Sequence, residues 1–594
     1  MPQKRRPISQ FWQELKRRRV VHVITVYASA SFVLIELVNN LTEPLNLPSS
    51  LATIVIIVLA VGFPLAIILS WLYDVSEEGV EKTKPIEEVK EGEKTAVPNA
   101  WRIATIISFV VILGLVTFNI IEGNRHLRAG DIQSLVILPF ENFTGDDQLE
   151  NMVFSMHSLL IGDMGRISGL RVIGKTSSKT YKDTDMSAKD IARELNVDAV
   201  LEPTIMCLGD SVCMQFRLVS TTGEEDQIWV GDYREDKRQI LNLFNRLTRQ
   251  VADEVMIELT PEEERLLSIS KTVDREAYDD YLVGLSFLED FSKEGLYNAM
   301  EKLNNAIEKD PDWAPLYAGL AKAWLVIAQA GYVSPSLAYQ NVYENLDKAL
   351  ELGPDLSNSH FISGMSAYLY EWNWDKGEKE LLKALAINPN DVMSRIYYAQ
   401  LLVILQRPEE ASTQGQLAFD LDPLNPLLQV LYSALLVGVD DCETALAHLE
   451  KVVAVDPGNV MANNVIELAA FRCKDYKRAF RAAKYILGFI IEEDVFKKIE
   501  RILDEQGFTS AYVEIAQQME AYVENNPIAP IELAVRYIYA NMPDKAMDWL
   551  EKGFELRDPN MPYIATPIYN LDPLHDNPRF IDIVEKMNLP LPKD

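Results

Sequence analysis

The sequence predicts a multi-domain fold: transmembrane helices, then a small α/β domain, then an all-α helical solenoid. Three observations support this prediction. The first 125 residues contain long uncharged runs, short apolar runs typical of strands follow from residue 132, and a 34-residue period occupies the second half. A chain of 594 residues is also longer than a single hydrophobic core usually supports, so several domains are expected.

Asp-Pro and Asn-Pro turns recur at a constant interval in the second half of the chain. Asn388-Pro389, Asp422-Pro423 and Asp456-Pro457 follow one another at 34 residues. Small residues keep the same phase: Gly377, Ala411, Ala445 and Ala479. A period of this length, with small residues where two helices cross, indicates helix pairs that bury their apolar faces only against neighbouring pairs.

This pattern resembles the tetratricopeptide repeat (TPR) family over residues 275–486. Asp310-Pro311 closes an earlier repeat, and Gly353-Pro354 follows 43 residues later, which predicts an insertion around Ser334-Pro335-Ser336. Beyond Asp456-Pro457 the pattern decays, because Glu467 falls where a small residue is expected. Further helical hairpins and a C-terminal cap are predicted for residues 487–594.

The TPR resemblance implies a curved superhelix that binds protein partners on its concave face and performs no chemistry. Within the repeats we find no run of Lys, Asn and Arg that would form a clamp for a peptide carboxylate. The sequence therefore leaves the residues of the binding surface and the identity of the partner open.

The first 125 residues predict a membrane module. Residues 1–19 are basic, and residues 20–125 hold three apolar segments, at 20–41, 51–73 and 103–121, with a charged loop at 74–99. Residues 51–73 contain no charge, and 23 residues at about 1.5 Å each exceed a hydrocarbon core of about 30 Å. The segment at 20–41 contains His22 and Glu36, so an interfacial helix is the alternative for it.

Basic residues around these segments set the predicted orientation. Lys16-Arg17-Arg18-Arg19 and the lysines of the charged loop favour the cytoplasmic side. Phe11 to Arg18 and Tyr73 to Val80 resemble the membrane module that precedes TPR regions in many bacterial envelope and signalling proteins. With three spans, this predicts a multi-pass protein of the bacterial inner (cytoplasmic) membrane whose C-terminal region is periplasmic.

Residues 132–259 predict a compact α/β domain. Leu135 to Phe140 is a short apolar run before a turn and indicates a buried strand, and the elements that follow give the order β-α-β-α-β-β-β. Ile137 to Asn142 and Ile191 to Glu202 resemble the N-terminal domain of TolB and related envelope proteins. That resemblance implies a periplasmic location and supplies no catalytic residue.

One segment satisfies a nucleotide-binding pattern. Gly169 to Thr176 matches the phosphate-loop motif GxxxxGK[ST]. In a phosphate loop the four central residues form a tight turn after a strand, whereas here Leu-Arg-Val-Ile favours a strand and follows a helical stretch. The sequence therefore predicts no nucleotide cofactor.

Composition argues against several classes of function. A net charge of -31 disfavours binding of nucleic acid, because an acidic surface repels a polyanion. The six histidines are scattered, and neither CxxC nor HExxH occurs. We therefore predict no catalytic, cofactor-binding or metal-binding residue.

The four cysteines bear on the redox environment. Cys207 and Cys213 flank the predicted turn around Gly209-Asp210, where paired strands would place them opposite each other. A disulfide is one hypothesis for this pair, and two buried thiols are the other. Cys442 and Cys473 are interpreted as small apolar residues of the solenoid.

Together these features predict a membrane-anchored TPR scaffold that mediates protein–protein interactions in the bacterial envelope, without catalysis. Its expected partners are proteins and the lipid bilayer, and its oligomeric state is open. The alternative is a membrane-bound signalling receptor or regulator whose effector domain is on a separate partner. An enzyme ranks third, since no catalytic constellation has a defensible spacing.

Overall fold

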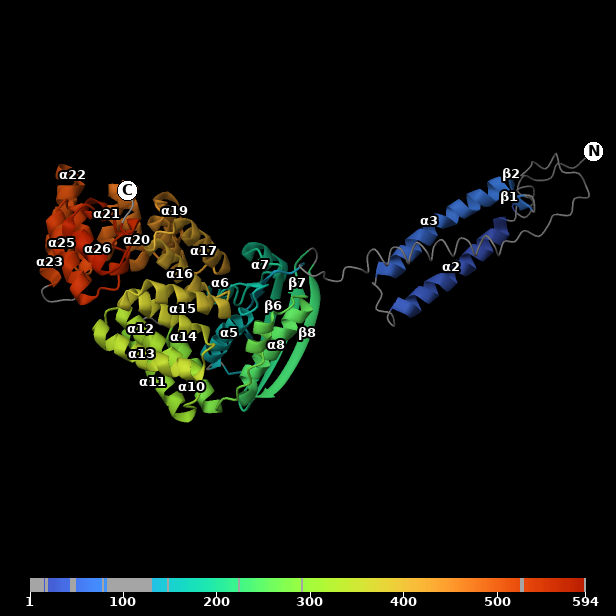
Figure 1. Ribbon diagram of the computed structural model, residues 1–594. Coiled ribbons are helices and arrows are strands. Elements are labelled where there is room, and N and C mark those ends of the chain that lie inside the picture. Colours follow the sequence, from blue (N-terminus) through green and yellow to red (C-terminus); the bar gives the residue numbers. More distant parts are fainter. Residues whose placement is uncertain are drawn as a thin grey trace, which may run out of the picture. The chain divides into compact units, whose positions relative to one another are not determined.

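The computed structural model describes residues 15, 20–42, 50–76, 79–82, 131–146, 149–222, 225–289, 292–523 and 528–591. The chain divides into two compact units, residues 1–126 and 127–594. Figure 1 labels most of the elements of each unit.

The first unit contains a helical hairpin. Helices α2 (Val20–Thr42) and α3 (Ser50–Leu72) pack side by side, and the Tyr27 hydroxyl donates a hydrogen bond of 2.9 Å to the Leu59 carbonyl oxygen. Two short antiparallel strands follow, β1 (Tyr73–Ser76) and β2 (Gly79–Lys82), where the sequence predicted the start of a charged loop.

The predicted transmembrane helices and the predicted inner-membrane localisation are wrong. Among the described residues, no helix combines the length and the apolar character that a membrane crossing requires. The predicted spans 20–41 and 51–73 correspond to α2 and α3, and the third, 103–121, lies outside the described residues. The prediction counted uncharged residues, yet such runs also serve helix pairing: Val20 and Val55 are buried within this unit.

The second unit begins with an α/β domain built on one mixed sheet. Its strands are β3 (Ser134–Ile137), β4 (Glu141–Asn142), β5 (Arg171–Val172), β6 (Ala199–Leu208), β7 (Ser211–Ser220) and β8 (Asp226–Asp236). The strand order is β5-β3-β6-β7-β8, and β4 pairs with β6. Strand β3 is parallel to β5 and β6, whereas β6, β7 and β8 form an antiparallel meander.

Helices cover both faces of this sheet. They are α5 (Glu150–Met164), α6 (Lys175–Lys179), α7 (Ala188–Leu195), the 3-10 turn η3 (Lys237–Gln239), α8 (Ile240–Glu254) and α9 (Pro261–Leu267). Successive residues of β3 point to opposite faces: Leu135 and Ile137 pack with α5 and α8, whereas Val136 packs with α7. The core under α5 and α8 continues into the first helices of the solenoid, through Tyr278 and Leu303.

The rest of the unit is a TPR-like solenoid of helix pairs. The pairs are α10 (Arg275–Phe287) with α11 (Lys293–Lys309), α12 (Ala314–Gln329) with α13 (Pro335–Leu352), α14 (Ser357–Ser366) with α15 (Trp374–Ile387), α16 (Val392–Ile404) with α17 (Pro408–Leu421), α18 (Pro426–Gly438) with α19 (Cys442–Val455), α20 (Val460–Arg472) with α21 (Tyr476–Leu487), α22 (Glu493–Gln506) with α23 (Phe508–Val523), and α24 (Pro530–Tyr539) with α25 (Pro543–Leu556).

Small residues lie at the helix crossings, as the repeat pattern predicted. Ala411, Ala445 and Ala479 are fully buried. A Cβ added to Gly377 would lie 3.1 Å from the Cβ of Tyr368, which belongs to the π-helical turn η4 (Ala367–Glu371) that extends α14. The predicted insertion near Ser334-Pro335 is accommodated by longer helices, since α13 has 18 residues and α17 has 14.

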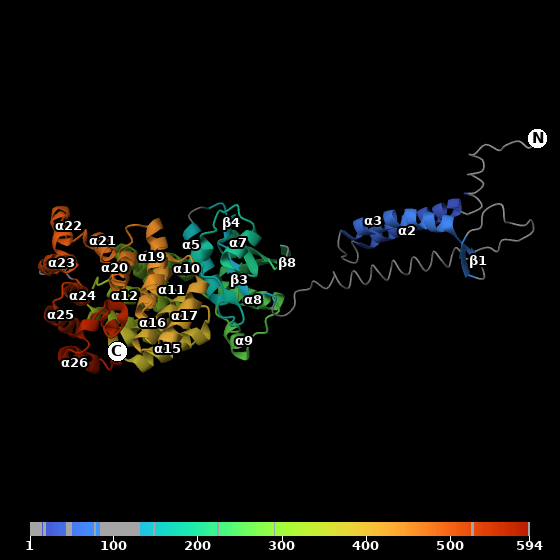
Figure 2. The ribbon, with the colours of Figure 1, turned by 90° about the horizontal axis from the view of Figure 1, so that it is seen from above.

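The chain ends with short turns and one helix. These are η5 (Met561–Tyr563), η6 (Pro567–Tyr569), η7 (Asp572–Leu574) and α26 (Pro578–Lys586). Figure 2 shows the C-terminal end of the chain near α15 and α16, and two hydrogen bonds confirm this proximity. Residues 557–591 are hereafter the C-terminal segment.

Candidate interaction site

Two successive repeat turns dock onto the α/β domain. In the turn after α15, the side chain of Asn390 reaches the backbone around β5: its Oδ1 accepts a hydrogen bond of 3.0 Å from Val172 N–H, and its Nδ2 donates to the carbonyl oxygens of Gly165 (3.0 Å) and Leu170 (2.9 Å). These bonds satisfy backbone groups that have no partner in regular secondary structure.

The next turn, after α17, uses a carboxylate in the same way. Asp422 is buried, and its Oδ1 accepts a hydrogen bond of 2.7 Å from Ser177 N–H. Gly174 N–H donates to the Leu421 carbonyl oxygen (2.6 Å), and Leu424 N–H donates to Ser177 Oγ (2.9 Å). The two turns thus hold the α/β domain mainly through hydrogen bonds between the side chains of Asn390 and Asp422 and the main chain of that domain.

This docking explains the structure of the phosphate-loop pattern at Gly169 to Thr176. The pattern contains strand β5 and the first residues of α6, so its central residues form a strand and not a cradle. The amide groups at the start of α6, which would face a phosphate, face the Asp422 carboxylate. Lys175 forms an ion pair with Glu289.

A buried serine and histidine lie behind α6. His157 Nε2 is 2.9 Å from the Ile137 carbonyl oxygen and 3.2 Å from Ser178 Oγ. Because a carbonyl oxygen can only accept, Nε2 carries the proton and cannot act as a base toward Ser178. Burial lowers the pKa of His157 to about 4, so the ring is neutral at pH 7. Both residues are shielded from solvent, and the pair supports packing rather than catalysis.

The first helices of neighbouring pairs line the inner side of the solenoid, where α16 contacts α18 and α18 contacts α20. The C-terminal segment lies along these helices. Tyr563 donates to Gln400 Oε1 of α16 (3.0 Å), and Asn570 Nδ2 donates to the Leu468 carbonyl oxygen of α20 (3.1 Å). Ile568 packs against Gly438 of α18.

Further contacts hold the ends of the C-terminal segment. Arg557 donates to the Tyr370 carbonyl oxygen (2.6 Å), and Trp374 Nε1 donates to the Met587 carbonyl oxygen (3.0 Å). The concave face, which the TPR resemblance implied as the partner-binding surface, is therefore covered here by the C-terminal segment. One sequence signal could have indicated this: α16, VMSRIYYAQLLVI, is apolar nearly all round, which is typical of a helix covered on every side.

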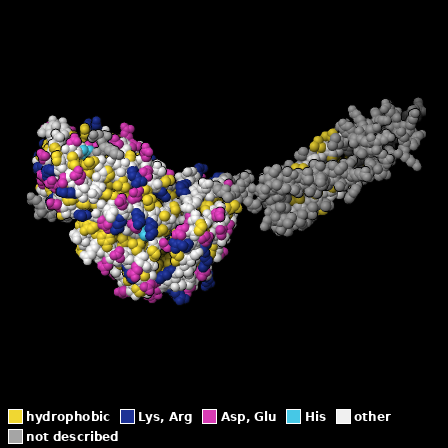
Figure 3. All heavy atoms as spheres, in the orientation of Figure 1, with side chains coloured by type: hydrophobic (Ala, Val, Ile, Leu, Met, Phe, Trp, Pro, Cys, Tyr) yellow, Lys and Arg dark blue, Asp and Glu magenta, His cyan; other side chains and the backbone are white. Residues whose placement is uncertain are grey.

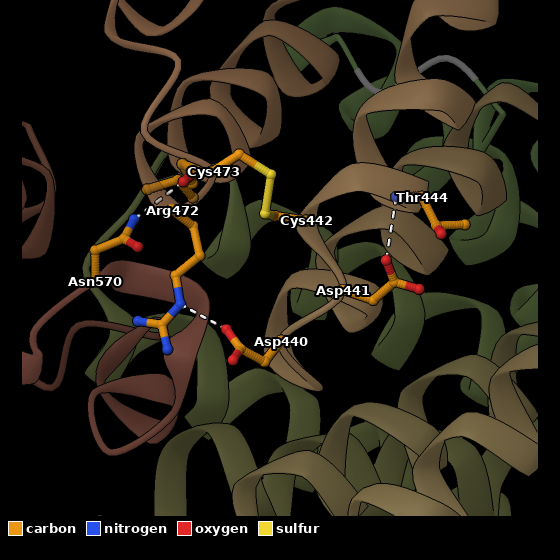
Figure 4. The surroundings of a disulfide bond; sticks show 8 residues. Asp440, Asp441, Cys442, Thr444, Arg472, Cys473 and Asn570 are labelled. Carbon is orange, nitrogen blue, oxygen red and sulfur yellow. Dashed lines mark hydrogen bonds and ion pairs between the residues drawn. A yellow bond between two sulfur atoms is a disulfide. The ribbon is translucent and has the colours of Figure 1, made fainter.

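The sequence-predicted cysteine pair lies on paired strands. Cys207 in β6 is opposite Cys213 in β7, with Cα atoms 4.8 Å apart and sulfur atoms 2.08 Å apart. Cys442 and Cys473, interpreted from sequence as apolar packing residues, also lie within bonding distance, at 1.96 Å. Figure 4 shows this second pair linking the start of α19 to the end of α20, beside an ion pair between Arg472 and Asp440.

Within the ranges that the structure describes, no group of three or more His, Cys, Asp or Glu side chains is arranged to hold a metal ion. On the face shown in Figure 3, basic and acidic side chains of the second unit are interspersed.

Comparison with known proteins gives partial matches. No family model matches the chain. Over 189 residues it is 28% identical to the protein named "Putative adenylate cyclase 3" of Rhizobium meliloti (strain 1021), a stretch that covers 32% of each protein. The chain thus spans about a third of the length of this relative.

Several solved structures of TPR proteins are similar to part of the chain. PilW, a type IV pilus biogenesis factor, is 12% identical, covering 38% of this chain and all of its own, with a TM-score of 0.31. Pseudomonas aeruginosa pilF is 16% identical, covering 38% of this chain and 98% of its own, with a TM-score of 0.29. Yeast Tom70 is 18% identical, covering 52% and 68%, with a TM-score of 0.29.

Proposed function

We propose that this chain is a scaffold for protein–protein interactions, built on a TPR-like solenoid and without catalysis of its own. The observation that carries the proposal is the docking of the α/β domain on the repeat turns through Asn390 and Asp422. Repeat turns of one geometry recur along the solenoid, so the same edge offers further positions for protein domains. The inner side, covered by the C-terminal segment, is the less accessible surface.

Crosslinking of the full-length chain in its native host, followed by mass spectrometry, tests this proposal. We expect a reproducible set of proteins crosslinked to residues 275–591, with most sites on the repeat turns and outer helix faces. A full-length chain that crosslinks to no protein above a matched control, or only through residues 1–126, would contradict the proposal.

A second candidate is a signalling regulator whose effector is on a separate partner. It is favoured by the 189 residues shared with a protein whose name describes an adenylate cyclase. Incubation of the full-length chain with ATP and Mn²⁺, with detection of cyclic AMP, separates the possibilities. Cyclic AMP formation would overturn the scaffold proposal, whereas an inactive chain that crosslinks to a cyclase in its host would favour the regulator.

We further propose that residues 132–259 form a TolB-like domain. The proposal rests on the resemblance of Ile137 to Asn142 and Ile191 to Glu202 to that family. An experimental structure of the domain tests it: a strand order other than that of TolB N-terminal domains would contradict the resemblance.

A further inference from the structure

The outward face of α21 differs in charge from the rest of the chain. The protein as a whole has 57 Lys and Arg against 88 Asp and Glu. Residues 474–489 reverse this balance, because their only acidic residue is Asp475 and their basic residues are Lys474, Lys477, Arg478, Arg481 and Lys484. A local basic surface on an acidic protein indicates a site for an anionic group.

The basic residues at the two flanks of this face form ion pairs within the solenoid, whereas those at its centre do not. Arg478 forms an ion pair with Glu450 of α19 (2.6 Å), and Lys484 forms one with Glu500 of α22 (2.9 Å). Lys477 and Arg481 lie between them, one helical turn apart and exposed. Neither has an ion-pair partner within the part of the chain that the structure describes.

Two aromatic side chains continue the same line. Tyr485 lies one helical turn after Arg481 on α21, and Phe489 lies in the turn that directly follows the helix; 52% and 83% of their surfaces are exposed. Lys477, Arg481, Tyr485 and Phe489 are hereafter the α21 stripe. Covering a large apolar side chain is favourable by about 25 cal/mol per Å², and contiguous exposed apolar residues indicate an interaction surface.

The α21 stripe extends to the row of repeat turns, two of which hold the α/β domain of the same chain. Ile387, Leu421 and Val455 each end a second helix just before an Asx-Pro turn. Ile387 and Leu421 are buried at the two turns that dock onto the α/β domain, whereas Val455 is 90% exposed at the next turn. Phe489 lies in the turn after that, so the apolar edge continues beyond the part that the α/β domain covers.

We propose that the α21 stripe binds an acidic amphipathic helix of a partner protein. Carboxylates one turn apart on such a helix match the spacing of Lys477 and Arg481, and apolar residues beside them cover Tyr485 and Phe489. A short peptide needs few charges for this contact, whereas a nucleic acid would bring a long polyanion toward a protein of charge -31. The inference rests on the proposed scaffold function.

The test measures binding of a defined probe to the full-length chain. The probe is a fluorescein-labelled helical peptide of 18 residues, with Glu repeated at i and i+4 and Leu on the adjoining face. We expect Lys477→Glu/Arg481→Glu to weaken binding about tenfold or more, since like charges replace opposite ones. Phe489→Ser should weaken it by a smaller factor.

The matched control is Lys379→Glu/Lys383→Glu, which reverses two exposed lysines at the same spacing on α15. This variant should bind the peptide as the wild type does. Equal weakening in the control, no saturable binding by the wild type, or tighter binding of poly(U) RNA than of the peptide would each overturn the proposal. If the stripe variants keep every crosslinked partner, the stripe proposal fails while the scaffold proposal stands.

Discussion

The carboxylate of Asp422 accepts a hydrogen bond of 2.7 Å from the backbone N–H of Ser177, a residue 245 positions earlier in the chain. This bond joins a repeat turn to the first turn of α6 and places a negative charge where helix N–H groups lack partners. It joins the α/β domain to the solenoid, two segments that the sequence predicted as separate domains.

Removing the Asp422 carboxylate should destabilise the second unit. Asp422→Ala leaves the buried Ser177 N–H without an acceptor, which costs about 1–3 kcal/mol, and Asp422→Asn should cost less. Urea unfolding of the full-length chain measures the change. The control is Asp456→Ala, at the equivalent but exposed position of the next turn, which should change stability by less than about 0.5 kcal/mol. Equal effects in both variants would contradict this role.

Gly174 should tolerate no side chain. A Cβ there would lie 2.6 Å from Cγ of Asp422, so Gly174→Ala forces the turn away from α6 and should cost about 1–3 kcal/mol. Gly162→Ala in α5 is the comparison, since its Cβ would meet no atom within 4 Å and alanine favours a helix by about 1 kcal/mol. Thermal unfolding should therefore shift in opposite directions for the two variants.

A buried ion pair connects α20 to α24 in the part of the solenoid where the repeat pattern decays. Glu467 of α20 is 0% exposed and accepts from Arg536 of α24 (2.7 Å) and from Tyr512 of α23 (3.0 Å). Glu467→Ala removes one of the two carboxylates that pair with the buried Arg536 guanidinium, the other being that of Glu532, and should cost about 1–3 kcal/mol in chemical denaturation. Glu467→Met/Arg536→Met should cost less than the single variant, because the buried site then holds no charge and the carboxylate of Glu532, which also loses its partner, is partly exposed to water. A double variant less stable than Glu467→Ala would contradict this account.

His157 should make stability depend on acid pH. Its pKa is about 4 in the folded protein, because burial disfavours the charged ring, against about 6.5 when unfolded. The unfolded chain therefore binds the proton more readily, and the stabilisation present above pH 6.5 is lost as the pH falls toward 4, by roughly 2–4 kcal/mol. His157→Gln keeps an N–H donor but cannot titrate. Denaturation between pH 7 and pH 4 should be less pH-dependent in this variant, and superimposable curves would refute the assignment.

We propose that both cysteine pairs are disulfides in the protein. Alkylation under denaturing conditions without reductant, followed by mass spectrometry, should then modify none of the four cysteines. Loop-closure entropy predicts about 2 kcal/mol for Cys207–Cys213 and about 4 kcal/mol for Cys442–Cys473, whose closed loop is longer. Variants with serine at both positions of a pair measure these values. Quantitative alkylation of Cys207 and Cys213 would instead support the two buried thiols.

Local patterns in the sequence predicted the helix pairs and most strands of the second unit, but the order β-α-β-α-β-β-β lacked the short elements β4 and α6. The 34-residue period identified the helix pairs, because each pair buries its small and apolar residues against its immediate neighbours. The predicted turn around Gly209-Asp210 correctly separated the two strands that carry Cys207 and Cys213. Counting uncharged residues led to the wrong prediction that residues 20–41 and 51–73 span a membrane. An apolar run can equally form a helix that pairs with another helix, as α2 and α3 do.

The sequence by itself determined the helix pairs of residues 275–486 and which residues meet within a repeat, because those contacts span a few tens of residues and repeat with a period. The tertiary structure alone decided that Asp422 meets Ser177, that Glu467 meets Arg536 and that the C-terminal segment covers the inner helices. These contacts join residues dozens to hundreds of positions apart. Their geometry follows from the curvature accumulated over many stacked pairs, which no local pattern records.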